Sequence, residues 1–117
     1  MHNFKKLKIW HDSMELVSKS YKITQTFPKF ETYGLISQMN RSAVSIPSNI
    51  AEGSSKSTDK HFSKYLEDSL GSAFEWETQL IIAFNENYLS EDTFKELEQK
   101  IKQIQKMVSS FKSGLKL

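Results

Sequence analysis

The chain has 117 residues, of which 38% are hydrophobic, 26% are charged and none is cysteine, and its formal net charge is +2. This length and composition predict a single folded domain over residues 1–117, with its own core, and argue against a disordered chain. Without cysteine there is no disulfide, thiolate metal site or cysteine nucleophile, and the sequence shows neither a bilayer-length apolar run nor a signal-peptide core, so we expect a cytoplasmic protein.

The first predicted helix covers about residues 9–26 and follows a short basic lead. Its apolar residues recur at helical spacing in two neighbouring stripes, which predicts a broad buried face. The first stripe contains Trp10, Met14, Val17 and Tyr21, and the second contains Leu16, Ile23 and Phe27. Pro28 ends the helix, because the residue before a proline is pushed out of helical geometry.

A second helix is predicted over residues 32–52, and it runs through a proline. The apolar positions keep steps of three and four residues on both sides of Pro47, at Ile36, Met39, Ala43, Ile46 and Ile50. Pro47 has no backbone donor and crowds the carbonyl of Ala43, at a cost of about 3 kcal/mol inside a helix. We therefore expect one kinked helix, which Gly53 ends in a left-handed conformation.

The stretch from Ser45 to Gly53 is also rich in small polar groups. Ser45, Ser48 and Asn49 are able to bond the freed backbone carbonyls or to reach a neighbouring helix. One interpretation is a ligand site built on the kink. The favoured interpretation is a structural kink that shapes helix packing near a subunit interface, because no complementary chemistry elsewhere completes a ligand site. The residues involved are Ser45, Pro47, Ser48, Asn49, Glu52 and Gly53.

Two longer helices are predicted over residues 58–86 and 91–115. The apolar stripe of the third helix is Phe62, Leu66, Ser69, Ala73, Trp76, Leu80 and Ala83, and that of the fourth is Phe94, Leu97, Ile101, Ile104, Val108, Phe111 and Leu115. Ser57 or Thr58 caps the third helix, Asn87 ends it, and Ser90 opens the fourth. With no β-type alternation and only short links, the chain is predicted to be all-α, an antiparallel up-down-up-down four-helix bundle.

The third helix carries more apolar residues than one buried face requires. Outside its main stripe lie Leu70, Phe74, Ile81, Ile82 and Phe84. Leu70, Ile81 and Phe84 can border the core, whereas Phe74 and Ile82 are harder to bury in a lone bundle. We therefore expect Phe74 and Ile82 to contact another copy of the chain, and packing of all five within one chain is the alternative.

The residue types that carry catalysis or bind metals form no recognisable constellation. Neither His11 nor His61 has a glutamate three residues before it, and the four glycines form neither a P-loop nor a dinucleotide-binding motif. We therefore expect no catalytic residue, no metal, no cofactor and no small-molecule substrate. A helix-turn-helix at residues 50–86 is disfavoured, because its second helix would be about 28 residues long with an apolar stripe along its whole length.

Two sets of charged residues remain as candidates. Glu77 lies on a largely apolar edge of the third helix and Arg41 is the only arginine, so we predict an Arg41–Glu77 ion pair within or between subunits, with two solvated charges as the alternative. Lysines also cluster near the start of the chain and around the start of the third helix, at Lys5, Lys6, Lys8, Lys56, Lys60 and Lys64. Such lysines usually form a solvated face, but oligomer symmetry could multiply them into an RNA-binding ring.

Several segments resemble one known family. They are Phe27-Pro28, residues 31–35, Gln38-Met39, residues 41–53, Gly71-Ser72 and residues 75–80, and the most specific part is Ser45–Gly53. In these segments the chain resembles the four-helix bundle proteins encoded in intervening sequences of bacterial 23S ribosomal RNA. It is also similar to the accessory protein of diversity-generating retroelements, a basic bundle that works with a reverse transcriptase and RNA.

The resemblance implies a homopentamer of four-helix bundles with no established enzymatic activity. The chain departs from the family pattern at Asn40, where a basic residue is usual, at Ser54-Ser55-Lys56, which replaces a Gly-Arg type of link, and at Glu86-Asn87, which replaces Leu-Gly. The first two departures remove arginines, the usual phosphate-binding residues. We therefore expect a non-enzymatic oligomeric assembly or adaptor protein, with an RNA- or DNA-binding accessory factor as the alternative.

Overall fold

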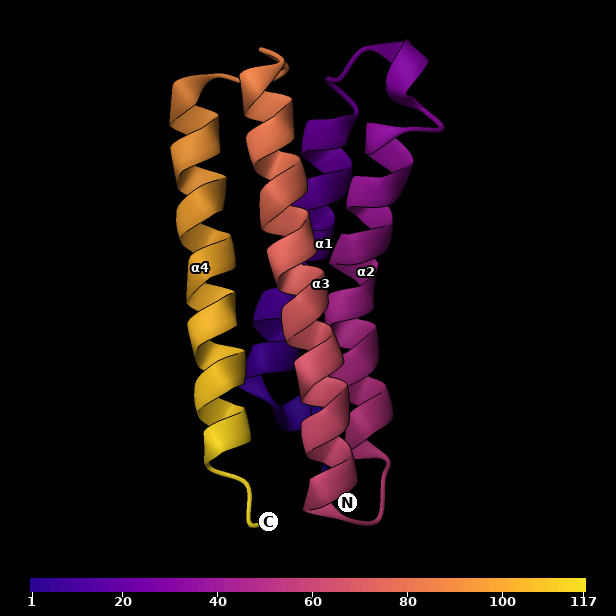
Figure 1. Cartoon of the computed structure of the whole chain (residues 1–117), viewed down its shortest axis with the longest axis vertical. Coiled ribbons are helices and arrows are strands. Elements are labelled where there is room, and N and C mark those ends of the chain that lie inside the picture. Colours follow the sequence, from indigo (N-terminus) through magenta and orange to yellow (C-terminus); the bar gives the residue numbers. More distant parts are fainter.

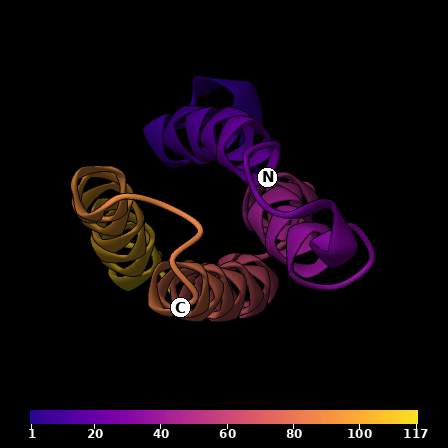
Figure 2. The same ribbon diagram turned by 90° about the horizontal axis from the view of Figure 1, so that it is seen from above.

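Four helices and two short 3-10 turns make up the fold in the computed structural model, which describes all residues from Met1 to Leu117. The elements are η1 (Phe4–Lys6), α1 (Lys8–Thr24), η2 (Lys29–Glu31), α2 (Leu35–Ser54), α3 (Asp59–Asn85) and α4 (Glu91–Ser113). The all-α prediction is confirmed, since there is no strand. Figure 1 shows the chain reversing direction at each connection, and Figure 2 shows the helices around the bundle in the order α1, α2, α3, α4.

The predicted caps at the starts of α3 and α4 and the predicted terminator of α3 are confirmed, whereas α4 ends at Ser113, two residues before the predicted end. The hydroxyl of Thr58 accepts a hydrogen bond from the backbone N–H of His61 at 3.2 Å, and the hydroxyl of Ser90 accepts one from the N–H of Thr93 at 3.2 Å. Asn87 adopts a left-handed backbone with φ of 63° just after α3. These short-range signals depend only on neighbouring residues, which is why the sequence shows them.

The core lies between all four helices and contains 18 buried hydrophobic residues. Every member of the stripe predicted for α3 is buried: Phe62, Leu66, Ser69, Ala73, Trp76, Leu80 and Ala83. In α4 the central members of the predicted stripe are buried, namely Leu97, Ile101, Ile104 and Val108, and the outer members are partly buried. No helix combines the length and the apolarity that crossing a membrane would need.

The buried face of α1 differs from the predicted one. Its buried residues are Ile9, Ser13, Leu16, Ser20 and Thr24, whereas Met14 and Tyr21 are 42% and 47% exposed. Three of the five buried positions are therefore polar. A search for hydrophobic residues does not select these serine and threonine positions. The buried face of α1 is visible in the sequence only as small hydroxyl residues that recur with Ile9 and Leu16 at steps of three and four residues.

A hydrogen-bond network explains why hydroxyl groups are buried there. Trp76 of α3 donates its indole N–H to the hydroxyl oxygen of Ser20 at 3.0 Å, and Ser20 donates to the amide oxygen of Asn40 on α2 at 2.8 Å. The amide nitrogen of Asn40 donates to Thr24 at 3.1 Å. The network joins three helices, and no buried side-chain nitrogen or oxygen is left without a partner.

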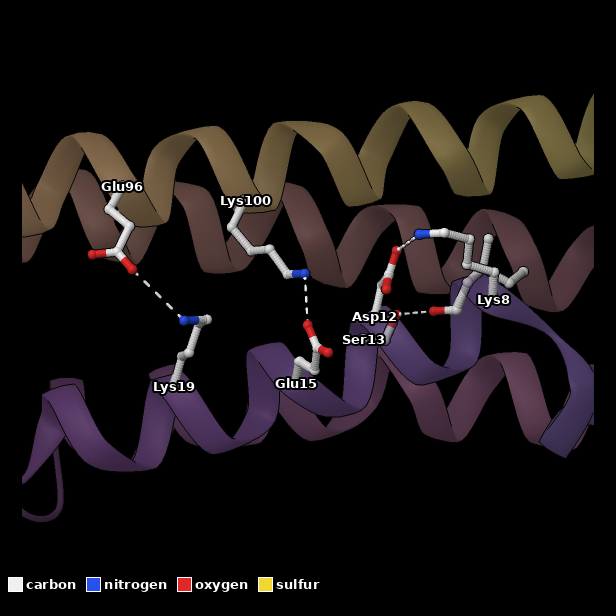
Figure 3. Close-up of polar contacts among 8 residues, drawn as sticks. Lys8, Asp12, Ser13, Glu15, Lys19, Glu96 and Lys100 are labelled. Atoms are coloured by element: carbon white, nitrogen blue, oxygen red, sulfur yellow. Dashed lines mark hydrogen bonds and ion pairs between the residues drawn. The ribbon is translucent and has the colours of Figure 1, made fainter.

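The other long side of α1 faces α4 and is polar. Lys100 of α4 donates to Glu15 at 3.0 Å, and Lys19 lies 3.6 Å from Glu96 (Figure 3). Glu15, Lys19 and Glu96 are largely exposed and Lys100 is partly buried, and ion pairs at such a surface are worth little stability individually. The two ion pairs nevertheless show that the side of α1 that faces α4 carries charged residues, whereas the apolar residues of α1 lie on its opposite side.

Helix α2 corrects two expectations. It begins at Leu35 rather than near Thr32, because the backbone of Gly34 is not helical, with φ −112° and ψ −111°. It also continues past Gly53 to Ser54, and Gly53 has no positive φ, so this glycine does not end the helix in a left-handed conformation. Pro47 lies inside the continuous helix, and a bend of the helix axis there stays a prediction.

Candidate functional site

The predicted site residues of α2 point in several directions. Ser45 donates its hydroxyl to the carbonyl of Arg41 at 3.0 Å, and the amide nitrogen of Asn49 donates to the carbonyl of Ser45 at 2.9 Å. Both side chains therefore bond the backbone of their own helix. Pro47 is buried, whereas Ser48 is exposed, and both line a groove between α1 and α2.

Gly53 lies where α2 packs tightly against α3. A Cβ atom at this position would stand 2.6 Å from Cβ of Tyr65 and 2.8 Å from Cδ1 of Phe62, which are distances that real side chains do not reach. About two turns earlier in α2, the carbonyl of Ile46, on the peptide that precedes Pro47, accepts a hydrogen bond from the hydroxyl of Ser69 of α3 at 3.0 Å. The side chain of Glu52 is exposed and forms no hydrogen bond or ion pair.

An apolar groove runs along the outside of the bundle between α1 and α2. We call it the α1–α2 groove, and it is lined by Phe4, Trp10, Met14, Val17, Val44, Pro47, Ser48 and Ala51. Apart from Ser48, every lining residue is hydrophobic. Trp10, Met14 and Val17, which the sequence pattern predicted to face the core, therefore line this groove. Their position explains why they are apolar and why they are incompletely buried.

Several side chains of this surface remain in contact with solvent in the single chain. Met14 is 42% exposed and Val44 is 38% exposed, and Tyr21, two turns after Met14 on α1, is 47% exposed. Trp10 and Val17 are only partly covered. Contiguous exposed apolar residues of this kind mark surfaces that bind other molecules.

A second exposed apolar surface lies on α3. Phe74 is 55% exposed and Ile82 is 44% exposed, in line with the expectation that they are hard to bury, and Ile81 is 38% exposed. Phe84 instead turns toward α4, where its ring stacks on that of Phe94 at a centroid distance of 4.4 Å. Contact of Phe74 and Ile82 with another copy stays a prediction.

The predicted Arg41–Glu77 ion pair does not form within one chain. The carboxylate of Glu77 accepts a hydrogen bond from the amide of Gln105 on α4 at 2.8 Å, and Arg41 is exposed without an acidic partner. The reason is helical geometry: Gln79 faces α2, where its Oε1 accepts a hydrogen bond from Ser42 at 2.6 Å, and two residues turn a helix by roughly 200°. Glu77 therefore points away from α2, and a pairing between subunits stays a prediction.

The six candidate lysines gather at one end of the bundle. Lys5, Lys6 and Lys8 lie in or beside η1, and the backbone N–H of His2 donates to the carbonyl of Ser54 at 3.0 Å, which ties this segment to the α2–α3 link. The link and the start of α3 carry Lys56, Lys60 and Lys64, and Figure 1 places both chain termini at the same end. Lys8 is paired with Asp12 at 2.8 Å, and the amine of Lys56 lies 5.1 Å from the centre of the Tyr65 ring.

A local contact at this end perturbs one carboxyl group. His2 lies 3.1 Å from Asp59, and the backbone N–H of Lys116 donates to the same carboxylate at 3.2 Å. The hydrogen bond with His2, followed by the one from Lys116, lowers the pKa of Asp59 below its ordinary value of 3.8.

At the opposite end, the hydrogen bond that the Tyr88 hydroxyl donates to Glu31 at 2.9 Å raises the pKa of Tyr88 above 10.0. No group of three or more His, Cys, Asp or Glu side chains is arranged to hold a metal ion.

Comparison with known proteins identifies the family. The family model of the 23S rRNA-intervening sequence protein matches residues 5–110, which include all of α1, α2 and α3 and most of α4. The chain belongs to the 23S rRNA-intervening sequence protein family. No curated protein matches it in sequence.

A solved structure shows the same fold. It is a protein of unknown function from the S23 ribosomal protein family of Bacteroides thetaiotaomicron, with a TM-score of 0.80 and 21% sequence identity. The match covers 89% of this chain and 97% of that protein. In this member of the 23S rRNA-intervening sequence protein family, the specific Ser45–Gly53 stretch contributes both to the α1–α2 groove, through Pro47 and Ser48, and to the contact with α3, through Gly53.

Proposed function

We propose that this family member is a non-enzymatic oligomeric assembly or adaptor protein, in which the oligomer is the functional unit. The observation that carries the proposal is the exposed α1–α2 groove, where Met14 and Val44 remain more than one third exposed in the single chain. Fully burying one such side chain is worth about 1.5–3 kcal/mol, so covering the groove provides a driving force for association. The homopentamer implied by the resemblance and the cytoplasm as the place of action are parts of this proposal.

Sedimentation velocity and native mass spectrometry test the oligomer directly. We expect a single species whose mass is an integer multiple of the 13.6 kDa chain, five-fold for the pentamer, across a wide range of protein concentrations. A clean monomer throughout this range would contradict the proposal. A stable oligomer of another number would retain the assembly function and reject only the pentamer.

A second candidate function is an RNA- or DNA-binding accessory factor. It is favoured by the gathering of Lys5, Lys6, Lys60 and Lys64 at one end of the bundle, all exposed and without an ion pair. Binding through such lysines weakens with salt, with a log–log slope of about −0.7 to −0.9 per contacted phosphate. Oligomer symmetry would repeat the cluster once per subunit and raise the local charge.

Fluorescence anisotropy with structured RNA and with duplex DNA tests this candidate. We expect the Lys60→Glu/Lys64→Glu variant to bind at least tenfold more weakly than wild type, and Lys95→Glu/Lys102→Glu on the outside of α4 to serve as a matched control with the same change of net charge. Absence of binding at low salt, or equal loss in both variants, would reject the candidate.

A further inference from the structure

We propose that copies of this chain bind one another head to tail, with the α1–α2 groove of one copy receiving the outer surface of α3 from the next. This inference rests on the proposed oligomeric function and adds to it the two surfaces that meet. The α3 surface is a ridge formed by Phe74, Thr78 and Ile82, which follow one another at intervals of four residues. Such a row forms a continuous ridge on a helix, and ridges of this kind pack into the grooves of neighbouring helices.

The ridge presents apolar atoms along its length. Phe74 and Ile82 are 55% and 44% exposed, and they stand about 12 Å apart along α3 at the usual rise per residue. The hydroxyl of Thr78 donates to the carbonyl of Phe74 at 2.9 Å, so its hydrogen-bonding capacity is used within the helix. In the groove, the lining residues Trp10 and Val17 stand about 10 Å apart along α1, with the exposed Met14 between them, which is close to the spacing on the ridge.

Charge distinguishes the two surfaces more sharply than shape does. Residues 65–94, which contain most of α3, carry seven acidic residues and no lysine, arginine or histidine. Four of these carboxylates are exposed and form no hydrogen bond or ion pair in the chain: Asp68, Glu75, Glu86 and Asp92. Glu75 follows Phe74 directly in sequence and Glu86 stands one turn after Ile82, so the ridge has acidic neighbours on α3, while Phe74 also lines a shallow pocket with Lys106 of α4.

The groove has the opposite charge at one end. Ser20 and Thr24 of α1 both bond Asn40 of α2, which places Lys22 and Arg41 at the same level of the bundle. Both cations are exposed, and neither has an acidic partner. Lys22 follows Tyr21 in sequence, and Arg41 stands three residues before Val44, which lines the groove. An acidic ridge that enters the groove would supply the missing partners.

The same charges argue against a contact between two identical surfaces. A contact between two grooves would bring the cations of both copies together, and a contact between two ridges would bring their unpaired carboxylates together. Both are unfavourable, because like charges across an interface cost free energy. Groove against ridge pairs opposite charges. A contact between two different surfaces is heterologous, and repeated copies of it form a ring where the rotation closes. Figure 2 shows that α3 lies across the bundle from α1.

Mixing of two interface variants tests the head-to-tail arrangement. Met14→Glu/Val44→Glu alters only the groove, and Phe74→Glu/Ile82→Glu alters only the ridge, at positions that are at least 38% exposed. Each variant retains one intact surface. We expect each variant alone to be monomeric, with self-association weakened at least a hundredfold, and a one-to-one mixture to form a dimer of one copy of each and nothing larger. Gln99→Glu/Gln103→Glu on the outside of α4 is the control and should assemble like wild type.

Circular dichroism and thermal unfolding establish that each variant is folded, and the single substitutions Met14→Glu and Phe74→Glu replace any double variant that loses its helical signal. Dissociation by only one of the two variants, or a mixture that stays monomeric, would overturn the head-to-tail contact while the wild-type oligomer stands. Assembly of both variants like wild type would overturn it as well. A wild-type chain that is itself monomeric would instead remove the proposed function on which the inference rests.

Discussion

At the scale of single residues, the hydroxyl of Ser20 links three helices of the bundle by hydrogen bonds. It accepts from the indole N–H of Trp76 and donates to Asn40, so one small side chain connects α1, α2 and α3. Trp76 and Ser20 are both fully buried. A buried polar group that loses its partner costs about 1–3 kcal/mol, which is more than the bond itself contributes in net terms.

Ser20→Ala is therefore expected to lower the free energy of unfolding by about 1–3 kcal/mol, because it leaves the Trp76 indole N–H without an acceptor. Urea denaturation measures the change. Ser18→Ala, at an exposed position of the same helix, is the matched control and should change stability by less than about 0.5 kcal/mol. In the Trp76→Phe background the donor is absent, so the cost of Ser20→Ala should shrink there; an equal cost in both backgrounds would contradict the role given to this bond.

The contact of Asp59 with His2 gives a second residue-scale prediction, for pH. The folded pKa of Asp59 is lowered, so its carboxylate stabilises the fold above pH 3.8, and this contribution is lost as the pH falls through the lower folded value. Asp59→Asn should therefore destabilise the protein near neutral pH more than Asp92→Asn does. Asp92 also lies in the first turn of a helix but has no partner, so it matches the helix-dipole effect.

Thermal unfolding of both variants between pH 7 and pH 2.5 measures the difference. The gap between Asp59→Asn and Asp92→Asn should close as the pH falls below 3.8. A gap that persists unchanged at the acid end would show that the cost of Asp59→Asn comes from something other than its charge.

The residues differ in how visible they are in the sequence. Thr58, Asn87 and Ser90 were predictable, because a cap or a left-handed terminator acts through its immediate neighbours. Ser20 and Thr24 were not, because their burial depends on Asn40 and Trp76, which are distant in the chain and meet them only in the folded bundle. The Arg41–Glu77 prediction failed within the chain for a related reason, since Gln105 of α4 already bonds Glu77.

At the scale of helices, the close approach of α2 to α3 at Gly53 fixes how these two elements pack. Gly53→Ala should destabilise the fold by about 1–2 kcal/mol in net terms, because the added methyl group meets Phe62 and Tyr65, and this overpacking exceeds the gain of up to about 1 kcal/mol in helix propensity. Gly71→Ala is the matched control. Nothing lies within 4 Å of the position of its Cβ, so it should stabilise the protein by about 0.4–1 kcal/mol. Urea denaturation of the two variants should give changes of opposite sign, and equal signs would contradict the close-packing argument.

The helices also show how far hydrophobic periodicity reaches. In α3 the predicted stripe is the buried one, and Phe74, Ile81 and Ile82 form a second apolar surface on the outside of the same helix. In α1 two apolar stripes were predicted, and the residues Trp10, Met14 and Val17 of the first stripe face the groove instead of the core. Periodicity reports every apolar face of a helix, and it does not distinguish a face that packs within the chain from one left for a partner.

At the scale of the whole molecule, charge is segregated although the net charge is only +2. Residues 65–94 contain no basic residue, and the cations Lys22 and Arg41 beside the groove have no acidic partner. A balanced total thus conceals two surfaces of opposite sign on one chain. Opposite surfaces steer the encounter of two copies, and apolar contacts, once formed, determine how long the copies stay together.

This division of roles predicts that salt acts mainly on the rate of assembly. Raising NaCl from 0.05 M to 0.5 M shortens the screening length well below about 10 Å, so the association rate constant should fall at least tenfold while the dissociation rate constant changes much less. Subunit exchange between donor- and acceptor-labelled copies measures both rates, and the absence of native cysteine allows one label at Ser113→Cys. The Lys22→Gln/Arg41→Gln variant should associate more slowly than wild type at low salt and depend little on salt, because it lacks the cations beside the groove. If this variant and wild type showed the same salt dependence, the charges that steer assembly would have to lie elsewhere on the surface, and the acidic ridge would not be meeting this groove.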